Sequence, residues 1–450
     1  MKDKGDDGNE ELSKVEKDIA KEACGQIDDS IKGLDSENGG FNPGHMWKLK
    51  SKVIPKPVQV PTAMIDPESG KLVTADNELK KHTISYYKNV LRNREIYVKL
   101  VEQKKEKEEL CKLRLQETKQ IKTKDWTEDD ILKALKDLKQ KKSRDPNMYA
   151  NEIFQPQVAG KDLIKAIQNL MNRIKNDSVY PKALTLCNIT SIYKHKGSHN
   201  IFSSYRGIFR VQALRNILER LLYNDEYSNI DSNLTDANVG ARQKRNIRDN
   251  IFVLNAVMNE AIQGSKEAVD ITVYDVEKCF DALWVQECIN DMYEAGLKNN
   301  KLNILFLMNQ HAQVAIKTSS GNTERTSMSN LIMQDTVWGS LFCTVSMDKL
   351  PRLQYENKEM LYKYRGVVSV PSLEMVDVIV GIKKCGKDSV ISNAVINSFI
   401  EHKKLTMGKA KCHQIHCGKK SSFCQELKVH NDKMHSSNEE TYLGDQINAN

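Results

Sequence analysis

Residues 271–281 read ITVYDVEKCFD, an apolar run of β-forming residues that contains one acid, Asp275, and is followed by a second, Asp281. A carboxylate at the end of a buried strand is costly unless something pairs with it, and a divalent cation does so. Asp281 can instead cap the next helix, a common role for Asp. That helix is expected to end near Gly296 and to bury Val285, Cys288, Ile289 and Met292.

Another embedded acid lies about a hundred residues further on, where residues 373–382 read LEMVDVIVGI. Asp377 is flanked by apolar residues in a segment that otherwise predicts a buried hairpin. Two such acids can converge on a pair of metal ions about 4 Å apart, the arrangement that polymerases use. Taken alone, the two acids fit ordinary caps and loop anchors better.

Apolar spacing predicts the surrounding elements. Thr127 is expected to cap a helix that has Asp129 and Asp130 in its first turn, where the helix dipole favours anions. Apolar stripes predict helices over 131–138, 163–174 and 211–222, and short apolar runs predict strands over 188–193, 271–276, 314–317 and 373–382. No internal repeat is visible, and the irregular alternation favours an α+β fold.

Three segments are expected along the chain. Residues 1–50 form a charged N-terminal tail, 51–125 a linker and a charged helical region, and 126–450 the main domain. The linker is expected to be extended over 51–76 because it is rich in Pro and Gly. The charges over 80–119 fit a solvated helix surface, with a nucleic-acid-binding stripe as the alternative.

Composition restricts the partners and the compartment. The chain has 450 residues, a net charge of +8 and 39% hydrophobic residues. This mild positive excess permits a nucleic-acid partner without requiring one. The polar N-terminus and the lack of a long apolar run predict no signal peptide and no membrane partner. Ten cysteines without a paired framework fit reduced thiols in the cytoplasm or nucleus.

Seven short motifs follow one another in a fixed order. They are SIYKHKG (191–197), YRGI (205–208), NVGAR (238–242), RDNIF (248–252), YDVEKCFD (274–281), QDTVWGSLF (334–342) and MVDV (375–378). This order resembles the reverse-transcriptase domain of non-LTR retrotransposons over roughly residues 126–445. The resemblance implies an α+β right-hand polymerase fold with fingers and an antiparallel palm sheet. No thumb is expected, because the chain stops just after the segment that resembles the end of the palm.

The resemblance also implies a function and a set of site residues. The expected reaction is RNA-templated DNA synthesis with two Mg²⁺ ions, an RNA template, a DNA primer and deoxynucleoside triphosphates. The implied metal ligands are Asp275, Asp377 and the backbone carbonyl of Val276, with the two acids as catalytic residues. The implied nucleotide-binding residues are Lys194, Arg206, Phe280 and Gln334, and the implied nucleic-acid-binding residues are Lys196, Arg242, Lys244, Arg245 and Arg248. Without the resemblance, Phe280 reads as a core aromatic and the lysines as solvated surface.

Two positions depart from the family pattern. Val378 stands where the family has the second acid of its pair, and Asp335 stands where it has Gly. The first change removes a negative charge beside the expected cations, and the second adds a charge that repels a triphosphate. The resemblance therefore implies a weakly active or inactive copy. The alternative is a nucleic-acid-binding remnant without catalysis, which would bind in a salt-dependent manner but need no Mg²⁺.

The C-terminal tail suggests a third hypothesis for the function, a small structural zinc module. The residues with suitable side chains are Cys412, His413, His416, Cys417, Cys424, His430 and His435. Their spacing is irregular and lacks the paired cysteines of common zinc modules. Ordinary strand and turn structure is therefore the favoured interpretation of this tail.

Overall fold

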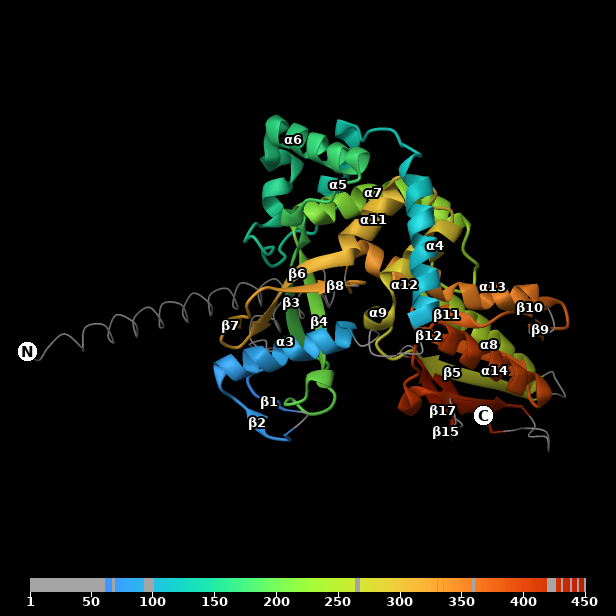
Figure 1. The fold of residues 1–450 in the computed structure, drawn as a ribbon. Coiled ribbons are helices and arrows are strands. Elements are labelled where there is room, and N and C mark those ends of the chain that lie inside the picture. Colours follow the sequence, from blue (N-terminus) through green and yellow to red (C-terminus); the bar gives the residue numbers. More distant parts are fainter. Residues whose placement is uncertain are drawn as a thin grey trace, which may run out of the picture. The chain divides into compact units, whose positions relative to one another are not determined.

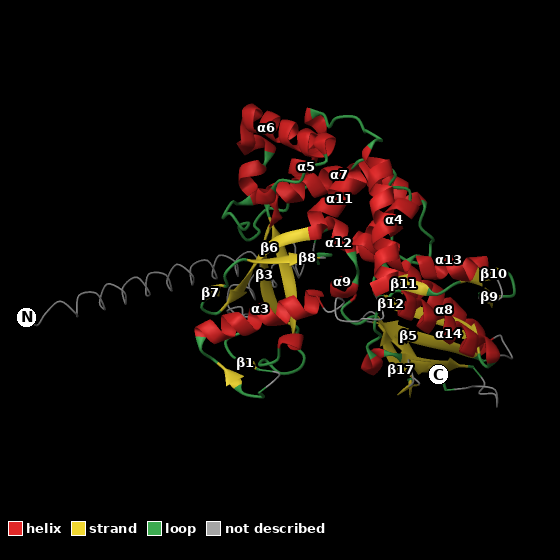
Figure 2. Ribbon diagram, in the orientation of Figure 1, coloured by secondary structure: helices red, strands yellow, loops and turns green. Residues whose placement is uncertain are grey.

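Helices and strands intermix along the chain, and the protein has the predicted α+β fold (Figures 1 and 2). The computed structural model describes residues 61–66, 69–92, 101–263, 268–329, 331–334, 336–357, 361–418, 426–429, 432–437, 439–442 and 445–448, which all belong to one compact unit. The expected charged tail over 1–50 lies outside the described residues, as do Asp335, Cys424 and His430. None of the helices in the described part is long and apolar enough to cross a membrane.

The first sheet contains strands from two distant parts of the chain. Its order is β4-β3-β6-β7, and β8 also pairs with β6. The strands are β3 (Leu186–Tyr193), β4 (Tyr205–Val211), β6 (His311–Thr318), β7 (Gly321–Asn322) and β8 (Thr326–Ser329). β3 is antiparallel to β4 and parallel to β6. Helix α3 (Asp76–Arg92) packs against this sheet through Tyr87, whose hydroxyl lies 2.9 Å from that of Ser191.

The second sheet carries the predicted acids. Its order is β11-β12-β5-β13-β16, antiparallel except for the last pair. The strands are β5 (Val269–Asp275), β11 (Leu373–Met375), β12 (Val378–Lys384), β13 (His413–Cys417) and β16 (His435–Ser437). Four two-stranded hairpins complete the strands: β1 (Met64–Ile65) with β2 (Leu72–Val73), β9 (Tyr362–Tyr364) with β10 (Val368–Val370), β14 (Lys428–Val429) with β15 (Asp432–Lys433), and β17 (Glu439–Tyr442) with β18 (Asp445–Asn448).

Both faces of β5 are covered, so its first six residues are buried. Helix α8 (Ile247–Gln263) packs on the face that carries Val269, Ile271 and Val273. Helix α14 (Lys387–His402) covers the other face, where the Tyr274 hydroxyl donates a 2.7 Å hydrogen bond to Asn393 Oδ1. The alternation of side chains along a strand therefore separates an apolar face from a more polar one.

The remaining helices form the largest hydrophobic core. They are α4 (Val101–Lys119), α5 (Glu128–Lys136), α6 (Pro156–Asp177), α7 (Ala213–Ser232), α9 (Cys279–Ala282), α10 (Val285–Glu294), α11 (Lys301–Gln310), α12 (Val337–Met347) and α13 (Lys349–Glu356). Two charged residues of α4 attach this helix to α10. Lys107 pairs with Glu287 at 2.9 Å, and Arg114 donates to the Asn290 carbonyl at 2.8 Å. Helices before residue 126 thus contact helices after it.

Local sequence signals predict several boundaries correctly. Thr127 caps α5 in a capping box with Asp130, and α10 ends just before Gly296, whose φ is +103°. One interpretation is wrong: Asp281 does not cap α10, because it lies inside the short helix α9. In the described part of the expected linker, the chain forms the β1–β2 hairpin, where Met64 is fully buried against a small cluster with Phe202 and Tyr205.

A buried ion pair on α7 joins this helix to α11 and α12. Arg215 and Glu219 of α7 are each 1% exposed and lie 3.0 Å apart. Arg215 also donates to the Met308 carbonyl at 2.7 Å, at the end of α11. Glu219 accepts a hydrogen bond from the Val337 N–H at 3.2 Å, at the start of α12. Three helices therefore depend on one desolvated pair of charges.

We predict that Arg215→Ala lowers the free energy of unfolding by about 3–5 kcal/mol, because it leaves the Glu219 carboxylate buried without its partner. Urea denaturation followed by circular dichroism measures this change. Arg173→Ala is the matched control, since Arg173 makes the same i,i+4 pair with Asp177 at an exposed position, 83% exposed; it should cost less than about 0.5 kcal/mol. Equal losses in the two variants would contradict the prediction.

Candidate functional site

Asp275 and Asp377 lie at the same end of two neighbouring strands. Asp275 is the last residue of β5, and Asp377 directly precedes β12, whose Val378 faces Asp275 across the ladder. The Val276 N–H donates a 2.9 Å hydrogen bond to the Asp377 carbonyl. Burial, together with the charge of Asp275, raises the pKa of Asp377 to about 6. The two acids that the sequence predicts as partners are therefore close enough to repel each other.

A lysine that the sequence analysis missed neutralises Asp275. The Lys411 ammonium donates to both carboxylate oxygens, at 2.7 and 2.9 Å. Gly408 brings this segment close, because its N–H donates to the Asp275 carbonyl at 2.8 Å. The ammonium thus marks a position where the acids attract a cation. No local pattern reveals this contact, since Lys411 and Asp275 are 136 residues apart.

Positive charges on and beside the first sheet act on Asp377 and Asp281. Arg206, exposed on β4, lowers the pKa of Asp377 against the larger effects of burial and Asp275. Burial also raises the pKa of Asp281 to about 6, while the nearby Lys278 and Lys194 act against this rise. Lys194 follows β3 and is exposed. Arg206 therefore shares one electrostatic environment with the predicted metal ligand Asp377. Burial and the nearby charges of Arg206, Lys278 and Lys411 lower the pKa of Lys194, so this residue lies close to the same group.

The turn between β11 and β12 is held in a strained conformation. Val376 has φ +59°, which a β-branched residue rarely adopts. Gly240 lies against this turn, since a Cβ at Gly240 would stand 2.6 Å from the Val376 nitrogen. The neighbouring Asn238 donates to the fully buried Glu374 at 3.1 Å, and the Glu374 N–H donates to the Ala237 carbonyl at 2.9 Å. The NVGAR segment thus supports the turn that carries Asp377.

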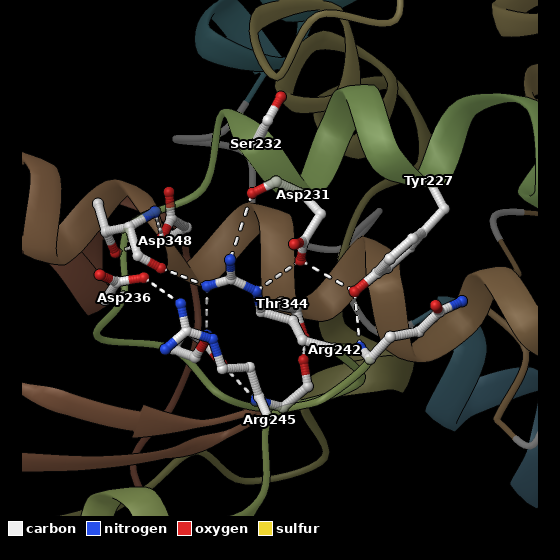
Figure 3. Close-up of polar contacts among 12 residues, drawn as sticks. Tyr227, Asp231, Ser232, Asp236, Arg242, Arg245, Thr344 and Asp348 are labelled. Atoms are coloured by element: carbon white, nitrogen blue, oxygen red, sulfur yellow. Dashed lines mark hydrogen bonds and ion pairs between the residues drawn. The ribbon is translucent and has the colours of Figure 1, made fainter.

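Arg242 also has a supporting position rather than an exposed one. Figure 3 shows its guanidinium between α7 and the loop that follows it, and the side chain is 3% exposed. It donates to Asp231 Oδ1 at 2.7 Å, to the Asn238 carbonyl at 3.0 Å and to the Thr235 carbonyl. These contacts leave Arg242 unsuited to the predicted contact with a nucleic-acid backbone, because its donors are already used inside the protein.

The remaining residues that the resemblance assigns to the site differ in exposure and in their contacts. Arg245 pairs with the exposed Asp236 (Figure 3). Lys244, Arg248 and Lys196 are exposed, the last in the connection between β3 and β4. Phe280 is partly buried and packs against the main core, and Gln334 is partly buried in the turn before α12. Val276, whose carbonyl is a predicted metal ligand, is 1% exposed as a residue and follows Asp275 directly.

A cleft of about 420 Å³ adds basic residues that the sequence analysis did not select. It is bordered by β4, the start of α7, the segment after α5, and Thr336 and Val337 at the start of α12. Its charged lining residues are the basic Lys139, Lys142, Arg210 and Arg220 and the acidic Asp137 and Asp145, which leaves an excess of positive charge. Their Lys and Arg side chains suit a phosphate backbone, but residue type alone does not separate them from other surface charges.

The tail does not gather its own metal-binding residues within the described part of the chain. Cys412 and Cys417 are fully buried, and His413 lies on β13. Among the described residues, one group of three ligand-type side chains lies close together, and it contains Asp270, Cys385 and His416. Two of its members come from outside the tail, so the spacing of tail residues gives no signal for it.

No protein-family model and no curated protein matches the chain.

The raised pKa of Asp377 predicts a pH-dependent effect of removing its charge. The ordinary pKa is 3.8, and the folded value is about 6, so ionising Asp377 costs stability as pH rises from about 4 to 6. Without metal, Asp377→Asn should be more stable than the unmodified protein by about 3 kcal/mol above pH 6, and the difference should vanish below pH 4. Urea denaturation in a chelator across this range measures it.

Asp162→Asn, which changes an exposed carboxylate on α6, is the matched control and should have little effect at any of these pH values. A stability difference for Asp377→Asn that is the same at pH 4 and pH 7 would count against the proximity of the two acids.

Proposed function

We propose that this chain is a nucleotidyltransferase of the reverse-transcriptase type, with Asp275 and Asp377 as the metal-binding acids. The observation that carries the proposal is their meeting at the ends of adjacent antiparallel strands, from sequence segments about a hundred residues apart. Both acids belong to motifs that resemble those of the same polymerase family. In this proposal the second sheet is the palm, and the first sheet with its helices forms the fingers.

The charges around the acids support a divalent cation there. Asp275 attracts the Lys411 ammonium, and Asp377 has a pKa of about 6 because it is buried beside Asp275. Hard oxygen ligands of this kind suit Mg²⁺. Asp275, Asp377 and the Val276 carbonyl would hold the ion, which would supply charge stabilisation to the transferred phosphoryl group.

The positive residues of β3 and β4 suggest how a nucleotide would be bound. Arg206 lies within electrostatic reach of Asp377, and Lys194 within reach of Asp281. A planar guanidinium can bind phosphate oxygens through two parallel hydrogen bonds, so Arg206 is the stronger candidate for a triphosphate ligand. The basic cleft at β4 would accept the backbone of a template strand.

Val378 is the main reason to expect low activity. It directly faces Asp275 in the ladder, and it packs against the apolar cluster beneath α8. An acid at this position would add a third carboxylate at the ends of the same two strands. Asp335, the second departure, lies outside the described residues.

A nucleic-acid-binding remnant is the second candidate function. The observation that favours it is the combination of Val378 with a basic cleft that does not depend on the acids. Such a remnant would bind RNA with a steep salt dependence and would keep this affinity in a chelator.

Primer extension on an RNA template in Mg²⁺ tests the proposal. Asp275→Asn should abolish extension, because this change removes the charge that binds the cation and keeps the shape of the side chain. Glu277→Gln is the matched control, since Glu277 is an exposed acid two positions away. Its extension should match that of the unmodified chain. RNA binding by both variants should be retained. Extension that survives Asp275→Asn would contradict the two-acid site, and binding without extension in the unmodified chain would favour the remnant.

We further predict that Val378→Asp raises the extension rate at least about tenfold, because restoring one charge beside a divalent cation is worth a kcal/mol or more. Val378→Asn is the matched control, as it has the same shape without the charge and should not raise the rate. The Asp335→Gly change can be added to both variants. A rate for Val378→Asp no higher than that of Val378→Asn would show that the missing acid does not limit activity.

A further inference from the structure

The end of β5 opposite Asp275 carries a second group of ligand-type side chains. Asp270 on β5 faces His416 on β13 in the ladder, and Cys385 follows the last residue of β12. The Cys385 N–H donates to the Ala268 carbonyl at 2.9 Å, so the backbone places this cysteine beside the start of β5. Asp270 and Asp275 are five positions apart along the strand, or roughly 17 Å. This group is therefore distinct from the candidate polymerase site.

The three side chains converge closely. One ligand atom from each lies within 4.8 Å of the other two. The Cys385 Sγ is 3.8 Å from His416 Nδ1, and that nitrogen also contacts Asp270 Oδ1. In a tetrahedral zinc site with bonds of about 2.0–2.3 Å, neighbouring ligand atoms lie roughly 3.2–3.7 Å apart. A small opening of the Asp270–His416 contact would therefore admit an ion.

The buried carboxylate of Asp270 has one oxygen atom without a hydrogen-bond donor among the described residues. Its residue is 1% exposed, and its Oδ2 atom has no hydrogen-bond partner among the described residues. The Oδ1 atom accepts from Gln414 Nε2 at 3.2 Å as well as from His416. Buried carboxylate oxygens are rarely left without a donor or a metal, because the desolvation cost is large.

We propose that Asp270, Cys385 and His416 bind one zinc ion. Sulfur, imidazole nitrogen and carboxylate oxygen together suit Zn²⁺ better than Mg²⁺ or Ca²⁺, which prefer oxygen alone. A thiolate and a carboxylate balance the two positive charges of the ion. A water molecule would complete four ligands. The ion would hold β5, β12 and β13 together at the start of α14.

Metal content and cobalt substitution test this site in the full chain. The protein is stripped with a chelator, loaded with zinc or cobalt and freed of excess metal. We expect about one zinc per chain, and a cobalt form with a thiolate charge-transfer band and the intense visible bands of tetrahedral coordination. Zinc loading should also raise the Tm. A cobalt form of the unmodified chain without a thiolate band would overturn the proposal, whatever the variants do.

Substitutions identify the ligands. Cys385→Ser and Asp270→Asn should weaken zinc binding at least about tenfold. Cys417→Ala is the matched control, because Cys417 is a fully buried thiol next to His416 that packs in the apolar cluster with α8. It should retain about one zinc per chain. Undiminished zinc in Cys385→Ser would overturn the proposal. These readouts do not involve nucleotide transfer, so they remain valid if the chain is not a polymerase.

Discussion

The register between β5 and β12 is the constraint on which the candidate site depends. Val378 opposite Asp275 fixes where the two strands end, and with it the position of Asp377. A shift by one residue would turn the side chains of a strand to the opposite face, which neither packed helix could accept. The strained backbone at Val376 is tolerated because neighbouring residues hold the turn in place. Gly240 packs against the turn, and Glu374 accepts a hydrogen bond from the loop that carries Gly240.

Residue patterns predict those parts of the molecule whose cause is local. The strand that carries Asp275, the hairpin that carries Asp377 and the Thr127 cap all arise from neighbouring residues, and the structure contains each. Lys411 could not be predicted in this way, because its partner is brought to it by the pairing of β13 with β5. Arg242 illustrates the opposite error. A basic residue in a basic cluster looks available for a ligand, and only the fold reveals that Asp231 and nearby carbonyls already bind it.

The two faces of β5 explain how one strand can hold both the candidate site at Asp275 and the proposed metal site at Asp270. The face beneath α8 is apolar and fixes the strand through hydrophobic packing. The face beneath α14 buries Asp270, Thr272 and Gln414, which need polar partners within the protein. Buried polar groups define a conformation sharply when they are satisfied and destabilise it when they are not. An ion bound at Asp270 would pair with this buried carboxylate and would hold the three strands that supply its ligands in one arrangement.

The order in which the strands of the second sheet occur along the chain has a consequence for folding. β5 is synthesised long before β12 and β13, the two neighbours that cover its edges. Before those two strands are made, β5 has unpaired backbone groups along both edges. Its first six residues, which are buried in the folded protein, are then exposed as well. Folds with such distant pairings form slowly and risk aggregation in the meantime. During translation, the site around Asp275 can therefore be completed only after the segment that carries Lys411 has been made.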